Sequence, residues 1–340
     1  MKRNIAIIAG GDSSEHEVSL RSAAGIYSFM DKERYDCTIV VFDGKNWHTE
    51  DGEPIDKNDF SFTRGGVKHT FDFAYITIHG TPGENGILQG YLDMIGMPYS
   101  CCGVLAAALT FNKYACNHYL SYFGFHIANS ILLRSTEYRI QSTDLITERI
   151  VKELGLPCFI KSNVGGSSFG CTKVKTVEEV YPAIERAFQE GDEVICESFM
   201  QGTEVTCGVY KTKEKAVAFP ITEVVTHNEF FDYNAKYKGE VDEITPARIP
   251  DAVRDKIQAE TLRLYDIIGA QGIIRVDWII TKTASLTEDR PASPDRVQIN
   301  LLEVNTTPGM TPTSFIPQQV RAAGLEMRDV LTDIIENKFN

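Results

Sequence analysis

The sequence has no excess of positive charge, no paired cysteine motif and no long apolar run. Its 34 Lys and Arg residues stand against 47 Asp and Glu residues, which gives a formal net charge of −13. So acidic a chain gains nothing from the phosphate attraction that drives nucleic-acid binding, and no basic cluster is present to hold it on an anionic membrane. We therefore expect neither a nucleic-acid partner nor a membrane partner.

None of the eight cysteines lies in a C-x-x-C pair, and most lie in apolar runs such as PCFIK and EVICES. This pattern is typical of reduced, buried thiols, so it argues against zinc sites and disulfide frameworks. No apolar stretch approaches the ~20 residues of a membrane span. The apolar run near the N-terminus is also too short for the core of a signal peptide. We expect a cytoplasmic protein.

The length of 340 residues suits two or three domains, and the 43% hydrophobic content predicts ordinary globular folding. An apolar run at 4–9 ends at two glycines and precedes a helical pattern, as at the start of an α/β domain. Similar strands are predicted at 37–42 and 73–78. The predicted units are an N-terminal α/β substrate-binding domain at 1–102, a central unit at 103–200 and a C-terminal unit at 201–340.

Further elements are predicted along the second and third units. In the central unit, Thr176 and Glu179 suit a capping box, and Pro182 should kink the helix that follows or delay its start. The predicted helices are 104–120, 177–189, 252–268 and one at the C-terminus. The predicted strands are 157–161, 193–197, 204–210, 216–224, 273–280 and 298–304.

The last two predicted strands carry polar side chains within apolar sequence. In IIRVDWII, alternation places Arg275 and Asp277 on one face and Trp278 on the other, and in LLEVN it places Glu303 and Asn305 on one face. A single charge in such a strand is equally well explained by a buried ion pair. Here, however, three side chains with hard oxygen atoms lie together beside an arginine. Such oxygens are the ligands of Mg²⁺ when it also binds substrate phosphates. The pattern predicts a Mg²⁺–nucleotide site.

A glycine-rich loop, KSNVGGSSFG, directly follows the strand at 157–161. It lacks the Lys-Ser/Thr spacing of a Walker A motif, and alone it is equally typical of a turn or a linker. Its backbone N–H groups and hydroxyls nevertheless suit phosphate oxygens, and Lys161 at the strand end can reach the same anion.

Two more loops leave strands of the first unit. HGTPGENGILQG begins with His79, which by itself is more often a hydrogen-bonded polar residue than a catalyst. In GGDSSEHEVS, Ser14 and Glu17 suit a helix cap, which leaves Glu15 without a structural role. Loops at the carboxyl ends of strands in open α/β sheets are where small ligands bind.

These four motifs, taken in their order along the chain, resemble those of the D-alanine–D-alanine ligases of the ATP-grasp superfamily. HGTPGENGILQG is similar to the family's first signature, and RVDWII…LLEVNTTPGMTPTS is similar to its second. The resemblance covers nearly the whole chain. It implies a three-domain ATP-grasp architecture, in which an N-terminal parallel-sheet domain precedes two α+β domains that clamp ATP. The implied reaction forms D-alanyl phosphate from ATP and one D-alanine. The amine of a second D-alanine then displaces phosphate, giving the dipeptide used for peptidoglycan precursors.

The resemblance also implies which residues bind the amino acids. Glu15 corresponds to the carboxylate that holds the ammonium of the first D-alanine, in a hydrogen-bonded set with Ser167 and Tyr237. Ser314 and the backbone at Phe315 correspond to the site for the carboxylate of the second D-alanine.

The remaining roles concern ATP, metal and the intermediate. Asp277, Glu303 and Asn305 correspond to ligands of two Mg²⁺ ions, for which Mn²⁺ could substitute. Arg275 and the backbone of Gly309 correspond to groups that stabilise the tetrahedral intermediate. The expected ATP contacts are Lys113 and Lys161 on the phosphates, Lys236 near the transferred phosphoryl group, Glu197, Ser198 and Met200 at the adenine, and Glu204 on the ribose.

Some alternatives remain open at this point. A ligase that makes D-alanyl-D-lactate or D-alanyl-D-serine is one, and Tyr237 argues against the lactate form because relatives that prefer D-lactate tend to lack it. A catalytically silent ATP-binding protein is another, although such a protein should have lost a metal ligand or Arg275. The sequence departs from the family at Trp278, at Phe315 and in a longer loop at 282–297. A homodimer is the default expectation for oligomeric state.

Overall fold

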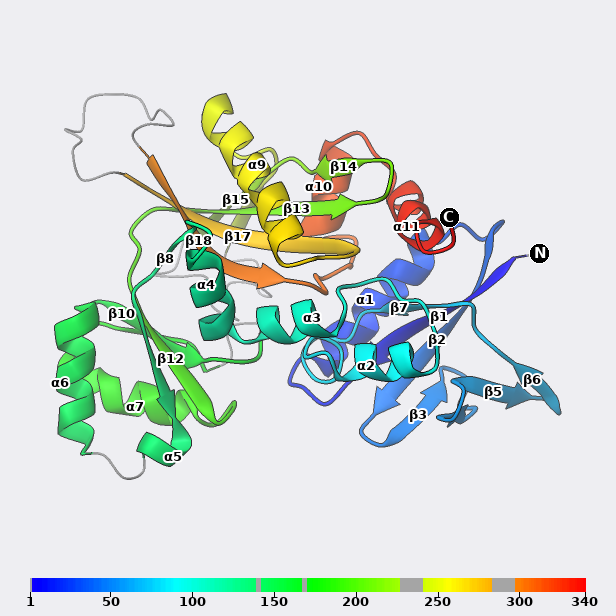
Figure 1. Ribbon diagram of the computed structural model, residues 1–340, viewed down its shortest axis with the longest axis horizontal. Coiled ribbons are helices and arrows are strands. Elements are labelled where there is room, and N and C mark those ends of the chain that lie inside the picture. Colours follow the sequence, from blue (N-terminus) through cyan, green and yellow to red (C-terminus); the bar gives the residue numbers. More distant parts are fainter. Residues whose placement is uncertain (1, 139–141, 167–169, 227–240, 283–296) are drawn as a thin grey trace.

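The computed structural model describes residues 2–138, 142–166, 170–226, 241–282 and 297–340. Figure 1 shows the strands of the N-terminal region on one side, the small sheet with α6 and α7 on the other, and the long strands β13, β17 and β18 above and between them. Within the described residues no helix is long and apolar enough to cross a membrane.

The N-terminal sheet has the order β3-β2-β1-β7, in which β1 runs parallel to both β2 and β7. Its strands are β1 (Arg3–Gly10), β2 (Tyr35–Asp43), β3 (Asn46–Thr49) and β7 (Phe73–Ile76), and its helices are α1 (His16–Phe29) and α2 (Ile87–Met94). The three predicted strands are therefore confirmed. A separate sheet of β4 (Ile55–Asp56), β5 (Ser61–Arg64) and β6 (Val67–His69) was not predicted.

The turn after β1 requires glycine. Gly10 has a φ of +87°, and a Cβ at this position would lie 2.3 Å from the carbonyl oxygen of Phe42. The turn thus brings the chain tightly past β2 and into α1, which begins at His16 with Glu15 at its N-cap. Ser14 is therefore not the N-cap residue.

The helical stretch predicted near 104–120 is present, but it is divided into two helices. They are α3 (Val104–Phe111) and α4 (Lys113–Ser121), separated by Asn112. The Asn112 side chain accepts a hydrogen bond from the Ala115 N–H at 2.9 Å and so caps the second helix. The break places Lys113 on the first turn of α4.

The central region forms an antiparallel sheet with the order β11-β10-β12-β9. Its strands are β9 (Ser130–Arg134), β10 (Cys158–Ser162), β11 (Thr172–Val174) and β12 (Glu193–Ser198), accompanied by α5 (Ser135–Tyr138), α6 (Thr143–Leu154) and α7 (Val177–Ala187). The predicted capping box of Thr176 and Glu179 is present. Pro182 lies inside α7 and does not delay its start, so that part of the prediction is wrong.

The largest sheet has the order β16-β15-β13-β17-β18-β8, with β14 paired to β13. Its strands are β8 (His126–Ile127), β13 (Thr203–Lys211), β14 (Ala216–Ala218), β15 (Thr222–Thr226), β16 (Val241–Ile244), β17 (Ile273–Lys282) and β18 (Val297–Asn305). The helices of this region are α9 (Asp251–Ile267), α10 (Phe315–Ala322) and α11 (Met327–Glu336). The one strand predicted at 216–224 is in fact β14 and β15, which the segment 219–221 separates.

The first and last parts of the chain share a hydrophobic core. Ile5 and Ile7 of β1 are packed in one cluster with Val330, Leu331 and Ile334 of α11. The hydroxyl of Tyr35 also donates to Glu336 Oε1 at 2.8 Å. This shared core holds the loops that leave β1 and β7 beside the loop that leaves β18, and the candidate site lies there.

Candidate active site

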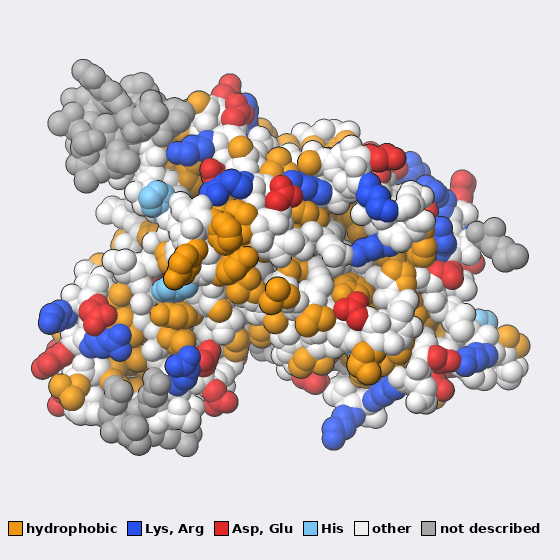
Figure 2. All heavy atoms as spheres, in the orientation of Figure 1, with side chains coloured by type: hydrophobic (Ala, Val, Ile, Leu, Met, Phe, Trp, Pro, Cys, Tyr) orange, Lys and Arg blue, Asp and Glu red, His pale blue; other side chains and the backbone are white. Residues whose placement is uncertain are grey.

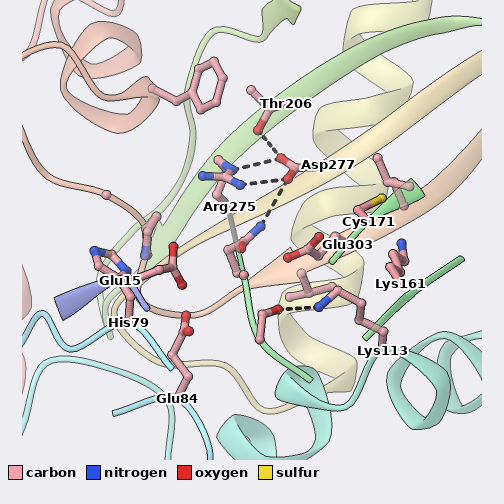
Figure 3. Close-up of a pocket in the computed structure, with 18 of the residues that line it drawn as sticks. Glu15, His79, Glu84, Lys113, Lys161, Cys171, Thr206, Arg275, Asp277 and Glu303 are labelled. Atoms are coloured by element: carbon pink, nitrogen blue, oxygen red, sulfur yellow. Dashed lines mark hydrogen bonds and ion pairs between the residues drawn. The ribbon is translucent and has the colours of Figure 1, made fainter. Parts of the chain in front are cut away.

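One cavity of about 990 Å³ lies where the three regions meet. Every predicted site residue that the structure describes lines it: Glu15, Lys113, Lys161, Glu197, Ser198, Met200, Glu204, Arg275, Asp277, Glu303, Asn305, Gly309 and Ser314. The other three predicted residues, Ser167, Lys236 and Tyr237, lie outside the described residues. Figure 3 shows side chains from the N-terminal loops, from α4 and from β17 and β18 converging on this space.

Arg275 and Asp277 of β17 form the centre of the site. The Arg275 guanidinium donates two hydrogen bonds to the Asp277 carboxylate, at 2.9 and 2.8 Å. Burial lowers the pKa of Arg275, but the charge and hydrogen bonds of Asp277, together with the charges of Glu303 and Glu204, raise it overall. The next residue, Trp278, points into the core, where its indole N–H donates to Thr261 Oγ1 at 3.1 Å. The alternation predicted for this strand is confirmed.

The oxygen ligands predicted for Mg²⁺ lie on facing positions of β17 and β18. The register places Glu303 opposite Asp277 and Asn305 opposite Arg275. Glu303 makes no hydrogen bond or ion pair with the residues that the structure describes, so its oxygens remain open to the cavity. These residues fit a hard cation, because carboxylate and amide oxygens are its usual ligands.

Asp277 is already heavily hydrogen-bonded. Thr206 Oγ1 donates to Oδ1 at 2.6 Å and Asn305 Nδ2 donates to Oδ2 at 3.1 Å, in addition to the two bonds from Arg275. A metal ion bound at Asp277 would compete with these donors. Rotating the Asn305 amide by half a turn would present its oxygen to Asp277 in place of its N–H group. Thr206 was not predicted, since a threonine inside a strand gives no distinctive signal.

Two lysines mark the end of the cavity next to the central sheet. Lys161 Nζ lies 2.7 Å from Glu197 Oε2, and both side chains are largely buried. Burial lowers the pKa of Lys161, but Glu197 and other nearby groups, Glu303 among them, raise it overall, so the ammonium stays charged. Lys113 Nζ donates to the carbonyl oxygen of Gly165 at 2.5 Å. The glycine-rich loop and α4 are thus joined at a cationic wall.

The segment after β12 forms another wall of the same end. The Ser198 N–H donates to the Asn129 carbonyl oxygen at 2.9 Å, and the Ser198 hydroxyl accepts from the Asn129 N–H at 3.1 Å. Met200 follows and Glu204 lies at the start of β13, both lining the cavity. Loss of solvation raises the pKa of Glu204 to about 7, and the nearby charge of Asp277 adds to the effect.

Cys171 lines the cavity at this end as well. Burial raises the pKa of its thiol to about 11, although Lys161 opposes the rise, so the thiol is protonated at neutral pH. Its sequence context does not distinguish this half-buried cysteine from the buried ones.

The opposite end of the cavity is formed by the N-terminal loops. Glu15 is only 7% exposed. A Cβ at Gly166 would lie 2.5 Å from Glu15 Oε2, so the glycine lets the central loop approach this carboxylate closely. The glycine-rich loop therefore reaches Glu15 at Gly166. Ser167, which was predicted to form a hydrogen-bonded set with Glu15, lies outside the described residues.

Sequence patterns did not identify Glu84. Its carboxylate accepts from the Gly80 N–H at 2.7 Å and from Thr307 Oγ1 at 2.7 Å. Loss of solvation raises the pKa of Glu84 to about 7, with a further contribution from the charge of Glu15. Figure 3 shows Glu84 and Glu15 on the same side of the cavity, with His79 beside them.

The loop after β18 leads into α10 and completes the cavity. Ser314 is the N-cap residue of α10, and its hydroxyl lies 2.7 Å from Thr311 Oγ1. Gly309 lies next to it, since a Cβ there would be 3.0 Å from Ser314 Oγ. The Phe315 ring lies under Arg275, whose Cζ is 5.3 Å from the ring centroid. This contact was not foreseen from the sequence.

Family comparisons agree with this geometry. A model described as the D-ala D-ala ligase N-terminus matches residues 4–102, and one described as the D-ala D-ala ligase C-terminus matches residues 119–336. This chain belongs to the D-alanine–D-alanine ligase family. The predicted resemblance is therefore confirmed, and so is the expectation of an ATP-dependent carboxylate–amine ligase.

Relatives and solved structures extend the match over full length. The D-alanine–D-alanine ligase of Bacteroides fragilis is 62% identical over 343 residues and covers 100% of both chains. That of Porphyromonas gingivalis is 53% identical, covering 99% of this chain and 98% of the relative. D-alanyl-alanine synthetase A from Vibrio cholerae has a TM-score of 0.83 at 28% identity and covers 99% of this chain and 98% of its own. A D-Ala:D-Ser ligase from Enterococcus faecalis has a TM-score of 0.82 at 28% identity, covering 99% of both. The predicted ATP-grasp architecture is thus confirmed for this ligase-family chain.

Proposed function

We propose that this protein uses ATP to join two D-alanines into D-alanyl-D-alanine through a D-alanyl phosphate intermediate, releasing ADP and phosphate, for peptidoglycan precursor synthesis. The observation that carries the proposal is the single cavity with lysines at one end, carboxylates at the other, and Arg275 between them. Phosphoryl transfer depends on positioning and charge neutralisation more than on covalent chemistry, and this arrangement supplies both.

Each end of the cavity has a proposed ligand. Lys113 and Lys161 bind the ATP phosphates, with Lys236 near the transferred group, while Glu197, Ser198 and Met200 contact the adenine and Glu204 the ribose. Glu15 holds the ammonium of the first D-alanine, together with Ser167 and Tyr237. Ser314 and the backbone at Phe315 bind the carboxylate of the second.

Arg275 and the backbone N–H of Gly309 stabilise the oxyanion that forms when the amine attacks the acyl phosphate. Fixed donors at a developing negative charge are typically worth ~10²–10³ in rate. Arg275 suits this task because the bidentate contact with Asp277 fixes its guanidinium and keeps it charged.

Asp277, Glu303 and Asn305 are the proposed ligands of two Mg²⁺ ions, with Mn²⁺ able to substitute. Among the described residues, no group of three or more His, Cys, Asp and Glu side chains is arranged to hold a metal alone. We infer that the Asn305 oxygen and the ATP phosphates complete the coordination. When bound, the metal supplies charge neutralisation at the phosphoryl groups.

The deciding experiment is phosphate release with ATP, Mg²⁺ and D-alanine, each omitted in turn. Release should require all three, and equal turnover in excess EDTA would overturn the metal assignment. Parallel assays with D-lactate and D-serine address the alternative products. The D-serine alternative has support, because the Enterococcus faecalis relative of similar fold is a D-Ala:D-Ser ligase. A silent ATP-binding protein would release no phosphate under any of these conditions.

We further propose three domains, at 1–102, 103–200 and 201–340, a cytoplasmic location and a homodimer. The four sheets and the two family matches support the first of these. An acidic chain with no disulfide among its described cysteines supports the second.

Exposed apolar side chains support the dimer. Leu105 is 80% exposed, Tyr122 is 92% exposed and Phe123 is 42% exposed. Figure 2 shows hydrophobic side chains gathered over α3 and α4 on this face. Such clusters mark contact surfaces more often than isolated apolar residues do.

Sedimentation tests the dimer. The native chain should sediment as a dimer and Leu105→Glu as a monomer, while Leu145→Glu, on the separate helix α6, should leave the dimer intact. A monomeric native chain would overturn this part of the proposal.

A further inference from the structure

Glu84 links two regions that are far apart in the sequence. Its Oε2 accepts from the backbone N–H of Gly80, in the loop after β7, and its Oε1 accepts from the hydroxyl of Thr307, in the loop after β18. Both distances are 2.7 Å, and 223 residues separate Glu84 from Thr307. The Thr307 hydroxyl also lies 3.3 Å from the carbonyl oxygen of Ile78. One carboxylate therefore fastens the N-terminal loop to the loop that follows the metal-ligand strand.

A second connection reaches the same loop from α1. The Met310 N–H donates to Ser22 Oγ at 3.4 Å, and Ser22 Oγ lies 3.2 Å from Nε2 of His79. The backbone also packs tightly here, because a Cβ at Gly25 would lie 2.3 Å from the Met310 carbonyl oxygen. The chain is thus held at Thr307 and again at Met310. Gly309 lies between these two points.

We propose that Glu84 is a positioning residue, which acts through Thr307 to hold the Gly309 backbone N–H where the oxyanion forms. This inference rests on the proposed function, in which Gly309 and Arg275 stabilise the intermediate. It assigns no contact between Glu84 and substrate. Preorganised donors lower a barrier only if they are already in place when charge develops, so the loop must be fixed before reaction.

The hydrogen bonds do not depend on the charge of Glu84. An ionised carboxylate accepts from both Gly80 and Thr307. A protonated one still accepts from Gly80 and can donate to the Thr307 hydroxyl, which then donates to the Ile78 carbonyl. Glutamine reproduces the second pattern with its amide group. A positioning role therefore predicts that Glu84→Gln works and Glu84→Ala does not, whereas an acid–base role predicts that both fail.

The two kinetic parameters should also separate. The nucleotide end is held by the Lys161–Glu197 pair and the Lys113–Gly165 contact, neither of which involves Glu84 or Thr307. Changes at the link should therefore leave the KM for ATP within about twofold and act on kcat, because they displace a group needed only in the transition state.

The experiment is steady-state kinetics on matched variants of the full chain. Thr307→Val should lower kcat about tenfold and Glu84→Ala by about tenfold to a hundredfold, since misplacing a reacting group by about 1 Å costs on that order. Glu84→Gln and Thr307→Ser should stay within about threefold of the native enzyme, because they keep the hydrogen bonds. Thr281→Val is the control, since it removes a hydroxyl at the far end of β17. The double variant Glu84→Ala/Thr307→Val should be no slower than Glu84→Ala alone.

Two outcomes would overturn the inference: a Glu84→Gln enzyme as slow as Glu84→Ala, or additive losses in the double variant. Hydrogen exchange of the segment 305–312 without substrates gives a readout independent of the reaction. Exchange should be faster in Thr307→Val than in the native chain, and unchanged exchange would also overturn the link. Failure of the proposed function looks different, because the native enzyme would then release no phosphate while the exchange difference remained.

Discussion

The two ends of the cavity differ in the charged groups that they present. At one end Lys113 and Lys161 are held by a carbonyl oxygen and by Glu197, and the pKa of Lys161 is raised. At the other end Glu15 and Glu84 lie near each other, and the pKa of Glu84 is raised to about 7. The first arrangement suits phosphates and the second suits an ammonium group. An acidic chain with this arrangement could bind an anionic substrate through a few placed cations, without a general positive field.

Substitution of the proposed metal ligands on β17 and β18, which lie between the two ends, should have the largest effect on activity. Glu303→Ala is expected to lower kcat about a thousandfold or more, because metal charge stabilisation is worth several kcal/mol and each ~1.4 kcal/mol is a factor of ten. Phosphate release at increasing Mg²⁺ measures this. Its thermal unfolding should match that of the native chain, since no described residue pairs with Glu303. Near-native turnover would mean that Glu303 is not a ligand.

Asp277→Ala should lose activity to a similar extent but also lose stability. It leaves the Arg275 guanidinium buried without its bidentate partner, and removing one member of a buried pair costs ~3–5 kcal/mol. The comparison with Glu303→Ala therefore separates metal binding from structure.

The cationic end should show the next largest effect. Lys161→Met is expected to raise the KM for ATP about tenfold to a hundredfold, since a hydrogen bond to a charged group is worth ~1.5–3 kcal/mol. It also leaves the buried Glu197 carboxylate without its cationic partner, so the melting temperature should fall. Adding Glu197→Gln should restore the melting temperature without restoring the KM. If both recover together, Lys161 acts only through Glu197.

Two buried carboxylates, Glu84 at the carboxylate end and Glu204 at the lysine end, should make the stability of the chain depend on pH. The pKa values of Glu84 and Glu204 are both raised to about 7 from an ordinary value of 4.5. Between these pH values the folded chain holds more protons than the unfolded chain, so their contribution to stability falls as pH rises from 4.5 to 7. The loss is roughly 3 kcal/mol per residue at most. Glu84→Gln removes the titrating group at position 84. Between pH 5 and 8 the melting temperature of this variant should therefore fall less than that of the native chain. Equal slopes would contradict the raised pKa.

The smallest expected effect is at Phe315. Its ring lies under Arg275, and a cation–π contact of this kind is worth ~0.5–2 kcal/mol. Phe315→Leu should lower kcat about threefold to tenfold. With D-alanine and D-serine both present, the ratio of D-alanyl-D-alanine to D-alanyl-D-serine should change by a larger factor than the KM for ATP. No change in either would mean that the ring only fills space.

Residues in strands could be predicted from the sequence, but the contacts between them could not. Alternation in β17 placed Arg275 and Asp277 on one face and Trp278 on the other, because the period of two is fixed by the backbone. It could not reveal that Thr206 and Asn305 also bind Asp277, since these contacts depend on the register of β13 and β18. The same holds for Glu84, whose loop looks like a turn in sequence and becomes a link only when residue 307 packs against it.

Errors in the predicted elements have similar causes. The break at Asn112 went unnoticed because the apolar pattern continues through it, while its cap to Ala115 decides where α4 begins. The predicted site residues Ser167, Lys236 and Tyr237 lie outside the described residues and stay predictions.

The core that α11 shares with β1 has a consequence for how the chain is synthesised and folds. Ile5 and Ile7 belong to one buried cluster with Val330, Leu331 and Ile334, which the ribosome makes more than three hundred residues later. The N-terminal sheet is therefore incomplete during most of translation, with an apolar face that a chaperone or a transient contact must cover. This core is complete only when α11 is present. A nascent chain therefore cannot close it until residues 327–335 have been made.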